Sequence, residues 1–520
     1  MAYEEKLMEK GPISIDINYE INRLLQYGIR ENLIEEEDMI YIANRIIAIL
    51  KLKEFVILED LNIGDTPLHE ILDNILDFAY ECRVLQNNDV TYRDILDTEI
   101  MNCLMNNPSV INRRFKELYE EDKRKATDYY YGLSIASNYI RKDRIKKNLK
   151  WKSKTKYGDL DITINLSKPE KDPKLIALAR NMPQNNYPKC ALCYENVGFE
   201  GSINQAARQN HRVIPLDLND EKWYLQYSPY VYYNEHCIVF KKEHSPMKIV
   251  AATFKRLLDF IEQFPHYFLG SNADLPIVGG SILSHDHFQG GNYEFPMAKA
   301  EKLYEASIDG YEGVNVQYIN WPLDVIRITG NSKDELSELA YKIFTIWQKY
   351  THKEIGIEAF SKDTPHNTIT PIARRRGRKF QLDLVLRNNR TDENHPYGIY
   401  HPDESLHHIK KENIGLIEVM GLAVLPARLK EELKLLESVM VKKEDVSLLD
   451  TEDLEKHKDW CLKIMSKYDN INESNVQEIL QHEVGMKFMS VLECCSVFRM
   501  GNRKEAFYRF VNEINSKINL

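Results

Sequence analysis

Apolar and polar residues recur at helical intervals at both ends of the chain. Runs such as Ile95 to Tyr119 and Leu429 to Val441 mix apolar and charged positions in this way. Between the two ends the pattern changes, and Leu160 to Leu166 alternates strictly, which is typical of a strand. We therefore expect helical regions up to about residue 150 and from about residue 427 onward, with a mixed region between them.

Three segments of the mixed region carry clear signals. Met247 to Phe264 places four apolar residues on one helical face, which predicts a helix that covers a sheet. Ser332 with Glu335 forms an expected capping box before an apolar stripe, which predicts a second buried helix. Apolar residues at positions 380, 382, 384 and 386 alternate with Gln381, Asp383, Val385 and Arg387, which predicts a half-buried strand. Strands and helices thus recur in both halves of this region.

Composition and length limit the class of protein. A chain of 520 residues with 43% hydrophobic content exceeds the usual size of a single core, so we expect at least two domains. The net charge of -10 argues against general nucleic-acid or anionic-membrane binding. The start has no apolar signal segment and no stretch is long enough to span a membrane, which predicts a cytoplasmic protein. Six of the eight cysteines have no framework spacing, which indicates mostly reduced thiols.

The most distinctive chemistry lies between Val278 and Gly291. Three residues there, His285, His287 and Gln289, alternate along the chain, so an extended backbone would place them on one face. Glycine pairs on either side permit close approach of a ligand or of backbone. The segment therefore indicates a phosphoryl or nucleotidyl transfer site, although isolated histidines are more often surface or hydrogen-bonded core residues.

The run from His285 to Gln289 resembles the His-x-His-x-Gln signature of the galactose-1-phosphate uridylyltransferase branch of the histidine triad superfamily. The surrounding Gly-Gly-Ser-Ile-Leu-Ser-His-Asp-His-Phe-Gln-Gly-Gly run resembles the second class of that family, and the resemblance extends over nearly the whole chain. Histidine triad hydrolases carry a third histidine where this chain has Gln289. In the family, that exchange accompanies transfer to a phosphate acceptor instead of water.

The resemblance implies a double displacement in which His287 is the nucleophile. It would take the uridylyl group from UDP-glucose and pass it to galactose 1-phosphate, a step of the Leloir pathway of galactose metabolism. A backbone carbonyl would hold the other ring nitrogen of His287, and Gln289 would stabilise charge on the phosphoryl oxygens. The expected substrate-binding positions are Asn272, Gly280, Ser281, Arg376 and Lys379.

Two of these positions belong to a basic run from Arg374 to Lys379. Arginine suits bidentate phosphate contacts, but a solvated basic turn is the commoner outcome for such runs. Lys379 matches a family lysine that helps bind the sugar phosphate. The first class follows that lysine with a tyrosine and a glutamate that contact the hexose, whereas this chain has Leu384 and Val385. The hexose contacts must therefore come from elsewhere.

Cys190 and Cys193 stand at the spacing of half a zinc site. By itself the pair could equally be a redox pair or two buried hydrophobic residues. The family resemblance implies that His244, which follows a short apolar segment, and His285 complete the ligand set. Two sulfurs and two nitrogens suit tetrahedral zinc, and four protein ligands would make that zinc structural.

The resemblance also implies the fold class and the partners. We expect an α+β fold with two histidine-triad-like halves of antiparallel sheet and packed helices, flanked by helical extensions. The expected segments are an N-terminal extension (1–150), a catalytic half (151–305), a second half with substrate contacts (306–426) and a C-terminal region (427–520). The expected ligands are a UDP-sugar and a hexose 1-phosphate, with no organic cofactor, nucleic acid or membrane, and the expected assembly is a homodimer.

Two other functions remain open from the sequence. A dinucleotide polyphosphate or nucleotide-sugar phosphorylase would share the histidine nucleophile and a phosphate acceptor. A non-catalytic nucleotide-sugar binding protein would bind the same ligands without turnover.

Overall fold

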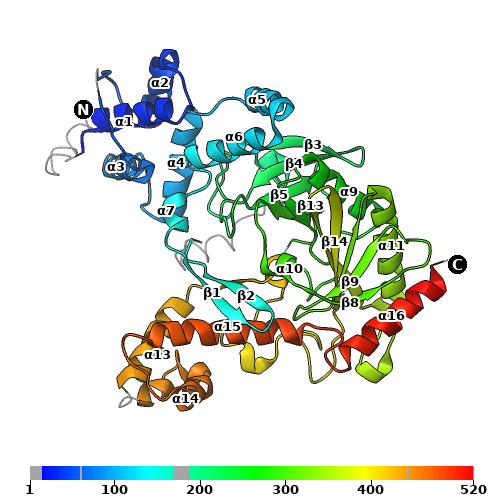
Figure 1. The fold of residues 1–520 in the computed structure, drawn as a ribbon. Helices are drawn as coiled ribbons and strands as arrows, with labels where there is room; N and C mark the ends of the chain where they lie inside the picture. The colour runs from blue at the N-terminus through cyan, green and yellow to red at the C-terminus, as the bar shows by residue number, and fades with distance from the viewer. Residues whose placement is uncertain (1–14, 59–60, 168–186, 281, 443–445, 519–520) are drawn as a thin grey trace. The chain divides into compact units, whose positions relative to one another are not determined.

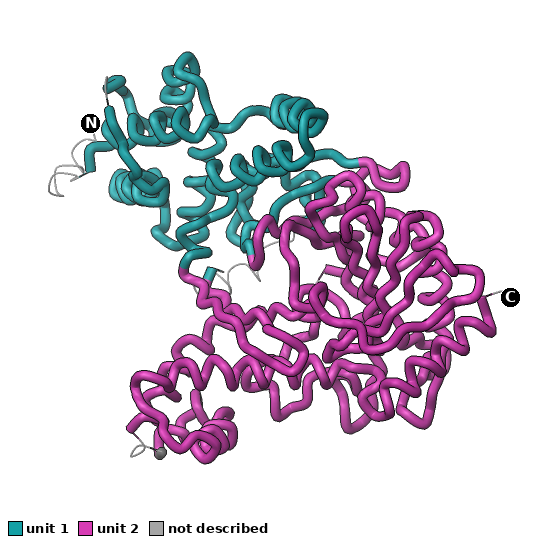
Figure 2. The backbone as a smooth tube through the Cα atoms, viewed as in Figure 1, with its two compact units in different colours: residues 1–146, 167–216, 224–231 teal, residues 147–166, 217–223, 232–520 magenta. Residues whose placement is uncertain are grey.

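A computed structural model describes residues 15–58, 61–167, 187–280, 282–442 and 446–518 of the protein (Figure 1). The chain divides into two compact units, coloured separately in Figure 2. The first unit comprises residues 1–146, 167–216 and 224–231, and the second comprises residues 147–166, 217–223 and 232–520. The four-segment division expected from the sequence remains a prediction.

The first unit is mainly helical, as the apolar periodicity predicts. Asp16 caps its first helix by accepting a hydrogen bond from the Tyr19 amide, and Asp122 caps another in the same way. Apolar faces such as Ile21, Leu24 and Leu25 are fully buried. The helices of this unit are α1 (Ile17–Arg30), α2 (Met39–Ile49), α3 (Leu68–Glu81), α4 (Val90–Cys103), α5 (Pro108–Glu121), α6 (Lys123–Ala136) and α7 (Lys142–Ile145).

A ten-stranded sheet carries the distinctive segment of the chain. Its strand order is β3-β4-β5-β7-β6-β13-β14-β10-β9-β8. The strands are β3 (Ile214–Leu218), β4 (Glu221–Tyr227), β5 (Cys237–Lys241), β6 (Phe268–Gly270), β7 (His287–Gly291), β8 (Lys302–Ala306), β9 (Asn315–Ile319), β10 (Val325–Gly330), β13 (Asn367–Arg376) and β14 (Lys379–Asn388). The neighbours from β5 through to β8 pair antiparallel, which confirms the expected α+β class.

The sheet consists of two halves with the same topology. The first half has the order β3-β4-β5-β7-β6, and the second half repeats it as β8-β9-β10-β14-β13. A long helix follows the third strand in each half, α9 (Ala251–Gln263) in the first and α11 (Lys333–Lys349) in the second. The halves join where β6 pairs with β13, with Gly270 opposite Ile372. The sheet therefore consists of two copies of one strand order, which are joined by the pairing of β6 with β13.

Both helices predicted from apolar stripes are present and pack on the sheet. α9 and α11 contact each other and β13. Ser332 caps α11 by accepting a hydrogen bond from the Glu335 amide at 3.2 Å. The predicted stripe residues Phe254, Leu257, Leu258 and Ile261 of α9, and Leu336, Leu339, Ala340, Ile343 and Trp347 of α11, are all fully buried.

The prediction that residues 380 to 387 form a half-buried strand was wrong in one respect. β14 is a strand, but its polar positions are as buried as its apolar ones, and Asp383 has no exposed surface. The guanidinium groups of Arg327 and Arg374 contact the Asp383 carboxylate at 2.6 Å, and Arg387 donates to the Ile414 carbonyl. Because internal partners satisfy these groups, both faces of β14 can be buried.

A smaller sheet and the C-terminal helices complete the second unit. Its order is β1-β2-β15, and the alternation predicted at residues 160–166 corresponds to β2. α15 packs on β1, where Trp151 and Ser153 donate to the Gln481 carbonyl at 3.0 Å. The remaining elements are β1 (Leu149–Thr155), β2 (Gly158–Ile164), α10 (Pro296–Lys299), β11 (Phe360–Ser361), β12 (Thr364–Pro365), α12 (Leu416–Val419), β15 (Leu422–Leu425), α13 (Leu429–Lys442), α14 (Lys458–Lys467), α15 (Val476–Cys494) and α16 (Arg503–Lys517).

Among the described helices, none combines the length and the apolar character that a membrane crossing requires.

Candidate active site

His287 is the first residue of β7 and is held in one defined state. Its Nδ1 lies 2.8 Å from the carbonyl oxygen of His285. Because a carbonyl only accepts, Nδ1 carries the proton and Nε2 keeps its lone pair. Burial lowers the pKa of His287 to about 4 and outweighs the hydrogen bond to the His285 carbonyl, which acts in the opposite direction. The imidazole is therefore neutral near pH 7, which is the form that acts as a nucleophile.

The strand that carries His287 is shorter than the sequence pattern suggests. β7 begins at His287, so His285 lies in the bend before it, and its Nε2 is 2.8 Å from the Lys241 carbonyl. His287 and Gln289 are two apart within the strand and share a face. Of the three alternating polar residues, His287 and Gln289 therefore lie on one strand face, and His285 lies in the bend before the strand.

Gln289 lines a pocket of about 370 Å³, here called the Gln289 pocket. The side chain of Gln289 is half-buried, but its Oε1 is fully buried and makes no hydrogen bond to the described residues. The carboxamide therefore presents its nitrogen side to the pocket. The other lining residues are Tyr232, Asn272, Gly279, Gly280, Lys410, Glu412, Asn413, Gly415, Leu416, Ile417, Glu418 and Val424.

A nearly buried lysine provides the positive charge of this pocket. The Nζ of Lys410 lies 3.1 Å from Glu418 and 3.5 Å from Glu412, and its side chain is 5% exposed. Burial alone would lower the pKa of Lys410, but the two carboxylates outweigh it and raise the pKa. The ammonium group therefore stays charged, next to carboxylates that can accept hydrogen bonds from hydroxyl groups.

Of the expected substrate-binding residues Asn272, Gly280 and Ser281, the first two line this pocket. Asn272 follows β6, and its Oδ1 accepts a hydrogen bond from the Leu416 amide at 2.9 Å. A Cβ placed on Gly280 would lie 2.7 Å from Asn272 Nδ2, so any larger residue there would displace the Asn272 carboxamide. Ser281, the third position, lies outside the described residues.

Arg376 and Lys379 lie elsewhere on the sheet. They pair with each other at the hairpin that joins β13 and β14, four residues after Ile372. Ile372 pairs with Gly270, and the chain runs from Gly270 to Asn272 away from that hairpin, so Asn272 lies at the opposite end of these strands. Arg376 contacts Glu294 at 2.6 Å and donates to the Ala298 carbonyl. Neither residue lines the Gln289 pocket. Their role in substrate binding remains a prediction.

The four residues expected to bind a metal do lie together. The ligand atoms of Cys190, Cys193, His244 and His285 are all within 4.8 Å of one another. The two sulfur atoms are 3.6 Å apart, close to the separation of about 3.8 Å that tetrahedral zinc–sulfur bonds of 2.3 Å would give.

The surroundings of these residues also fit a metal. The Leu192 amide points to the Cys190 sulfur at 3.4 Å, and Asn196 donates to the carbonyls of Cys190 and Cys193. His285 uses Nε2 on the Lys241 carbonyl, which leaves Nδ1 as the ligand atom. A second hydrogen bond of this kind commonly orients metal-binding histidines.

Comparison with known proteins agrees with this arrangement. The family model described as the galactose-1-phosphate uridyl transferase N-terminal domain matches residues 32–246, and that of the C-terminal domain matches residues 260–462. The chain belongs to the galactose-1-phosphate uridylyltransferase family.

Relatives of this uridylyltransferase chain match over nearly their whole length. The galactose-1-phosphate uridylyltransferase of Clostridium acetobutylicum is 54% identical over 95% of this chain and 99% of its own. That of Fusobacterium nucleatum is 53% identical (96% and 99%), and that of Bacillus subtilis is 49% identical (96% and 98%). Among solved structures, yeast Ap4A phosphorylase Apa2 aligns with a TM-score of 0.31 and 12% identity, covering 66% of this chain and 93% of its own.

Several residues of the Gln289 pocket were not predicted from the sequence. Lys410, Glu412, Asn413 and Glu418 come from the segment before and within α12, and Tyr232 comes from the segment before β5. The only local signal was a polar run, Lys-Lys-Glu-Asn, directly before Ile414 and Gly415. Such a run is usually a solvated loop, so its spacing gave no reason to single it out.

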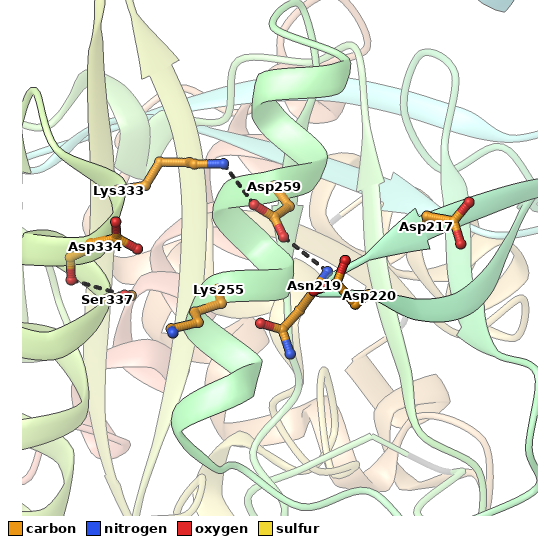
Figure 3. A pocket seen from close by; sticks show the side chains of 8 residues that line it. All are labelled: Asp217, Asn219, Asp220, Lys255, Asp259, Lys333, Asp334 and Ser337. Atoms are coloured by element: carbon orange, nitrogen blue, oxygen red, sulfur yellow. Dashed lines mark hydrogen bonds and ion pairs between the residues drawn. The ribbon is translucent and has the colours of Figure 1, made fainter.

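A second hollow in the uridylyltransferase chain does not resemble an active site. Figure 3 shows it on α9 and the start of α11, with a volume of about 280 Å³. Two of its charged groups pair with each other, since Asp259 contacts Lys333 at 2.7 Å, and Asp259 also accepts from the backbone amide of Asn219. Its lining residues are Asp217, Asn219, Asp220, Lys255, Asp259, Lys333, Asp334 and Ser337.

Proposed function

We propose that this protein transfers a uridylyl group from UDP-glucose to galactose 1-phosphate through a covalent uridylyl-His287 intermediate. The observation that carries the proposal is the state of His287, a buried neutral imidazole with Nδ1 fixed on the His285 carbonyl and Nε2 available. Its relatives, which are galactose-1-phosphate uridylyltransferases, support the same reaction.

The reaction proceeds in two displacements. Nε2 of His287 attacks the α-phosphorus of UDP-glucose, a nitrogen–phosphorus bond forms, and the bond to the bridging oxygen breaks to release glucose 1-phosphate. A phosphate oxygen of galactose 1-phosphate then attacks the same phosphorus, which gives UDP-galactose and restores the neutral imidazole. The Gln289 amide stabilises the charge on the phosphoryl oxygens in both steps.

The Gln289 pocket is suited to the sugar phosphate. Lys410 offers a charge to the phosphate, and Asn272 and Gly280 border the same space. Glu412, Asn413 and Glu418 supply acceptors and donors of the kind that recognise sugar hydroxyls, in place of the tyrosine and glutamate that the sequence lacks at Leu384 and Val385.

Cys190, Cys193, His244 and His285 would hold zinc, whose four protein ligands leave no open position for substrate. The metal would fix the bend that contains His285 and hence the carbonyl that orients His287. Metal analysis of purified protein tests this role, because fully active, metal-free protein would exclude it. The homodimer and the cytoplasmic location remain predictions, which sedimentation and cell fractionation would check.

The direct test is mass spectrometry after incubation with UDP-glucose. We expect a uridylyl adduct on His287, exchange of label between UDP-glucose and glucose 1-phosphate, and discharge of the adduct by galactose 1-phosphate. Discharge by orthophosphate in its place would assign the protein as a phosphorylase. Binding of UDP-glucose with no adduct and no exchange would show a binding protein, and an adduct on another side chain would refute the mechanism.

A further inference from the structure

Three buried polar atoms make no hydrogen bond to the described residues and belong to Gln289, which lines the Gln289 pocket, and to a nearby histidine. They are Oε1 of Gln289 and both ring nitrogens of His236, a residue that is 3% exposed. A buried polar atom without a hydrogen-bond partner destabilises the fold, so most buried polar atoms in proteins have one. Here an acceptor and a ring with donor capacity lie beside each other, so a small rotation would pair them.

Strand geometry independently places the two side chains together. In the pairing of β5 with β7, Ile238 stands opposite Gln289 and Cys237 opposite Gly290. His236 is two residues before Ile238 and therefore projects on the same face as Gln289, one step along the neighbouring strand. Diagonal neighbours of this kind lie within reach of a long or aromatic side chain.

Close backbone packing fixes the segment that carries His236. A Cβ on Gly291 would lie 2.6 Å from the Glu235 carbonyl oxygen, and one on Gly290 would lie 2.5 Å from the Phe268 carbonyl oxygen. Gly290 is thus required for β6, and Gly291 for the segment before β5, to lie against β7. Glu235 itself has a left-handed backbone, with φ of 51°, and its carboxylate accepts from Asn292 at 3.0 Å. A strained residue that is anchored in this way points to a functional constraint.

Two tyrosines hold the imidazole ring of His236. The ring of Tyr233 lies 4.5 Å from it and that of Tyr232 lies 5.5 Å from it. The Tyr233 hydroxyl donates to the Gly290 carbonyl at 3.0 Å, so this clamp is attached to the strand that carries Gln289. Tyr232 also lines the Gln289 pocket. The ring of His236 is therefore immobilised next to the pocket without lining it.

We propose that His236 is a positioning residue, which donates a ring N–H to Oε1 of Gln289 and so keeps the amide nitrogen of Gln289 turned toward the substrate phosphate. A carboxamide has two faces of similar shape, and only the nitrogen face can donate to a phosphoryl oxygen. A donor behind the oxygen face selects the productive orientation before the substrate arrives. This inference rests on the proposed function, because it assigns the device that orients a group of that active site.

The protonation of His236 agrees with this role. Burial lowers the pKa of His236 to about 3, and the Gln289 side chain, which lies within reach of the ring without forming a well-aligned hydrogen bond, acts in the opposite direction. The ring is therefore neutral near pH 7 and offers one donor.

Steady-state kinetics with His236→Phe test the inference. Phenylalanine keeps the ring between the two tyrosines but removes the donor. We expect kcat to fall about 10- to 100-fold, as for loss of an outer partner of a catalytic group, while KM for UDP-glucose changes less than about 3-fold. His236→Gln, which restores a donor, should recover part of the loss.

A double-mutant cycle separates positioning from general damage. In a Gln289→Ala background, His236→Phe should cause less than about a 2-fold further loss, because the group that it orients is absent. Additive losses, or full activity of His236→Phe alone, would overturn the inference.

The matched control is His211→Phe. His211 is also buried beside a tyrosine and bonded to a glutamine, with Nε2 3.0 Å from Oε1 of Gln226 and the Tyr139 ring at 4.5 Å, but it is not part of the pocket. It should leave kcat within about 2-fold of wild type.

A crystal structure gives a readout that does not depend on turnover. In His236→Phe the Gln289 side chain should leave its wild-type rotamer or become disordered, and an unchanged Gln289 would contradict the inference even if wild-type protein proved inactive. Wild-type protein without uridylyl exchange would count against the proposed function alone, so the two failures are distinguishable.

Discussion

The two halves of the large sheet share one topology but treat the same position in opposite ways. Gln289 of β7 pairs with Gly270, Gly270 pairs with Ile372, and Ile372 pairs with Asp383 of β14, so the four form one row across the centre. Gln289 and Asp383 thus occupy corresponding places, one strand away from the seam on each side. Gln289 has a buried oxygen without a hydrogen bond, whereas two arginines saturate the carboxylate of Asp383.

The difference shows how a duplicated framework divides stability from chemistry. In the second half the one polar side chain of the row, Asp383, is fully paired with two arginines, so it contributes to folding and has no hydrogen-bonding capacity left for a ligand. In the first half the Gln289 carboxamide borders a pocket, where its nitrogen side can donate to a ligand. Incomplete pairing, and not fold, distinguishes the candidate active half.

The largest expected effect concerns the first half. His287→Asn should lower exchange between UDP-glucose and labelled glucose 1-phosphate by roughly 10⁴-fold or more, because the nucleophile is lost. UDP-glucose binding, measured by calorimetry, should change little. His395→Asn is the matched control, since His395 is an exposed histidine of the second unit bonded to Asp392. Retained turnover in His287→Asn would remove the distinction between the halves.

The mirror experiment concerns the second half. Asp383→Asn should lower the free energy of unfolding by about 3–5 kcal/mol, because Arg327 and Arg374 keep buried charges without a counterion. Urea denaturation measures this, with exposed Asp392→Asn expected within about 0.5 kcal/mol of wild type. A neutral outcome for Asp383→Asn would mean that the row is not a stability element.

Acid should erase the effect of that substitution. Burial alone would raise the pKa of Asp383, but Arg327 and Arg374 outweigh it and lower the pKa to about 2. A folded-state pKa below the usual 3.8 means that the stabilisation is complete above about pH 4 and is lost as the pH falls toward 2. The difference in thermal midpoint between wild type and Asp383→Asn should shrink over this range. A difference that stays constant would disprove the assignment.

The smallest expected effect separates two lysines. Lys410→Gln should raise KM for UDP-glucose about 10-fold, because a charged hydrogen-bond donor leaves the pocket, while Lys379→Gln at the hairpin should stay within about 2-fold. Thermal midpoints control for folding, since Glu418 loses its partner. The reverse ranking would favour the assignment made from the basic run and would move the sugar phosphate to the second half.

The sequence predicted features that depend on local pattern. The stripes of α9 and α11 appear at helical spacing, and the His-x-His-x-Gln run keeps its reactive groups within five residues. The four candidate metal ligands, which the family resemblance supplied, also lie together in the fold.

Features that depend on distant partners could not be predicted in this way. Asp383 is buried because Arg327, 56 residues away, pairs with it, and no local rule distinguishes it from a solvent-facing position. Lys410 reaches the pocket from a polar run that looks like a solvated loop. His236 is a buried histidine, and nothing in its neighbouring sequence distinguishes it from other buried histidines. The roles of these residues depend on contacts with residues that are distant in the sequence, and a single sequence does not show such contacts.

The glycine pair that follows Gln289 constrains how the protein can be redesigned. A side chain at Gly290 would collide with the Phe268 carbonyl of β6, and one at Gly291 with the Glu235 carbonyl. β7, β6 and the segment before β5 can therefore be altered only as a unit. The wall formed by residues 410–418 carries no such restriction at its polar positions. An engineer who seeks a new acceptor specificity should therefore diversify that wall and leave the tyrosine-lined side untouched.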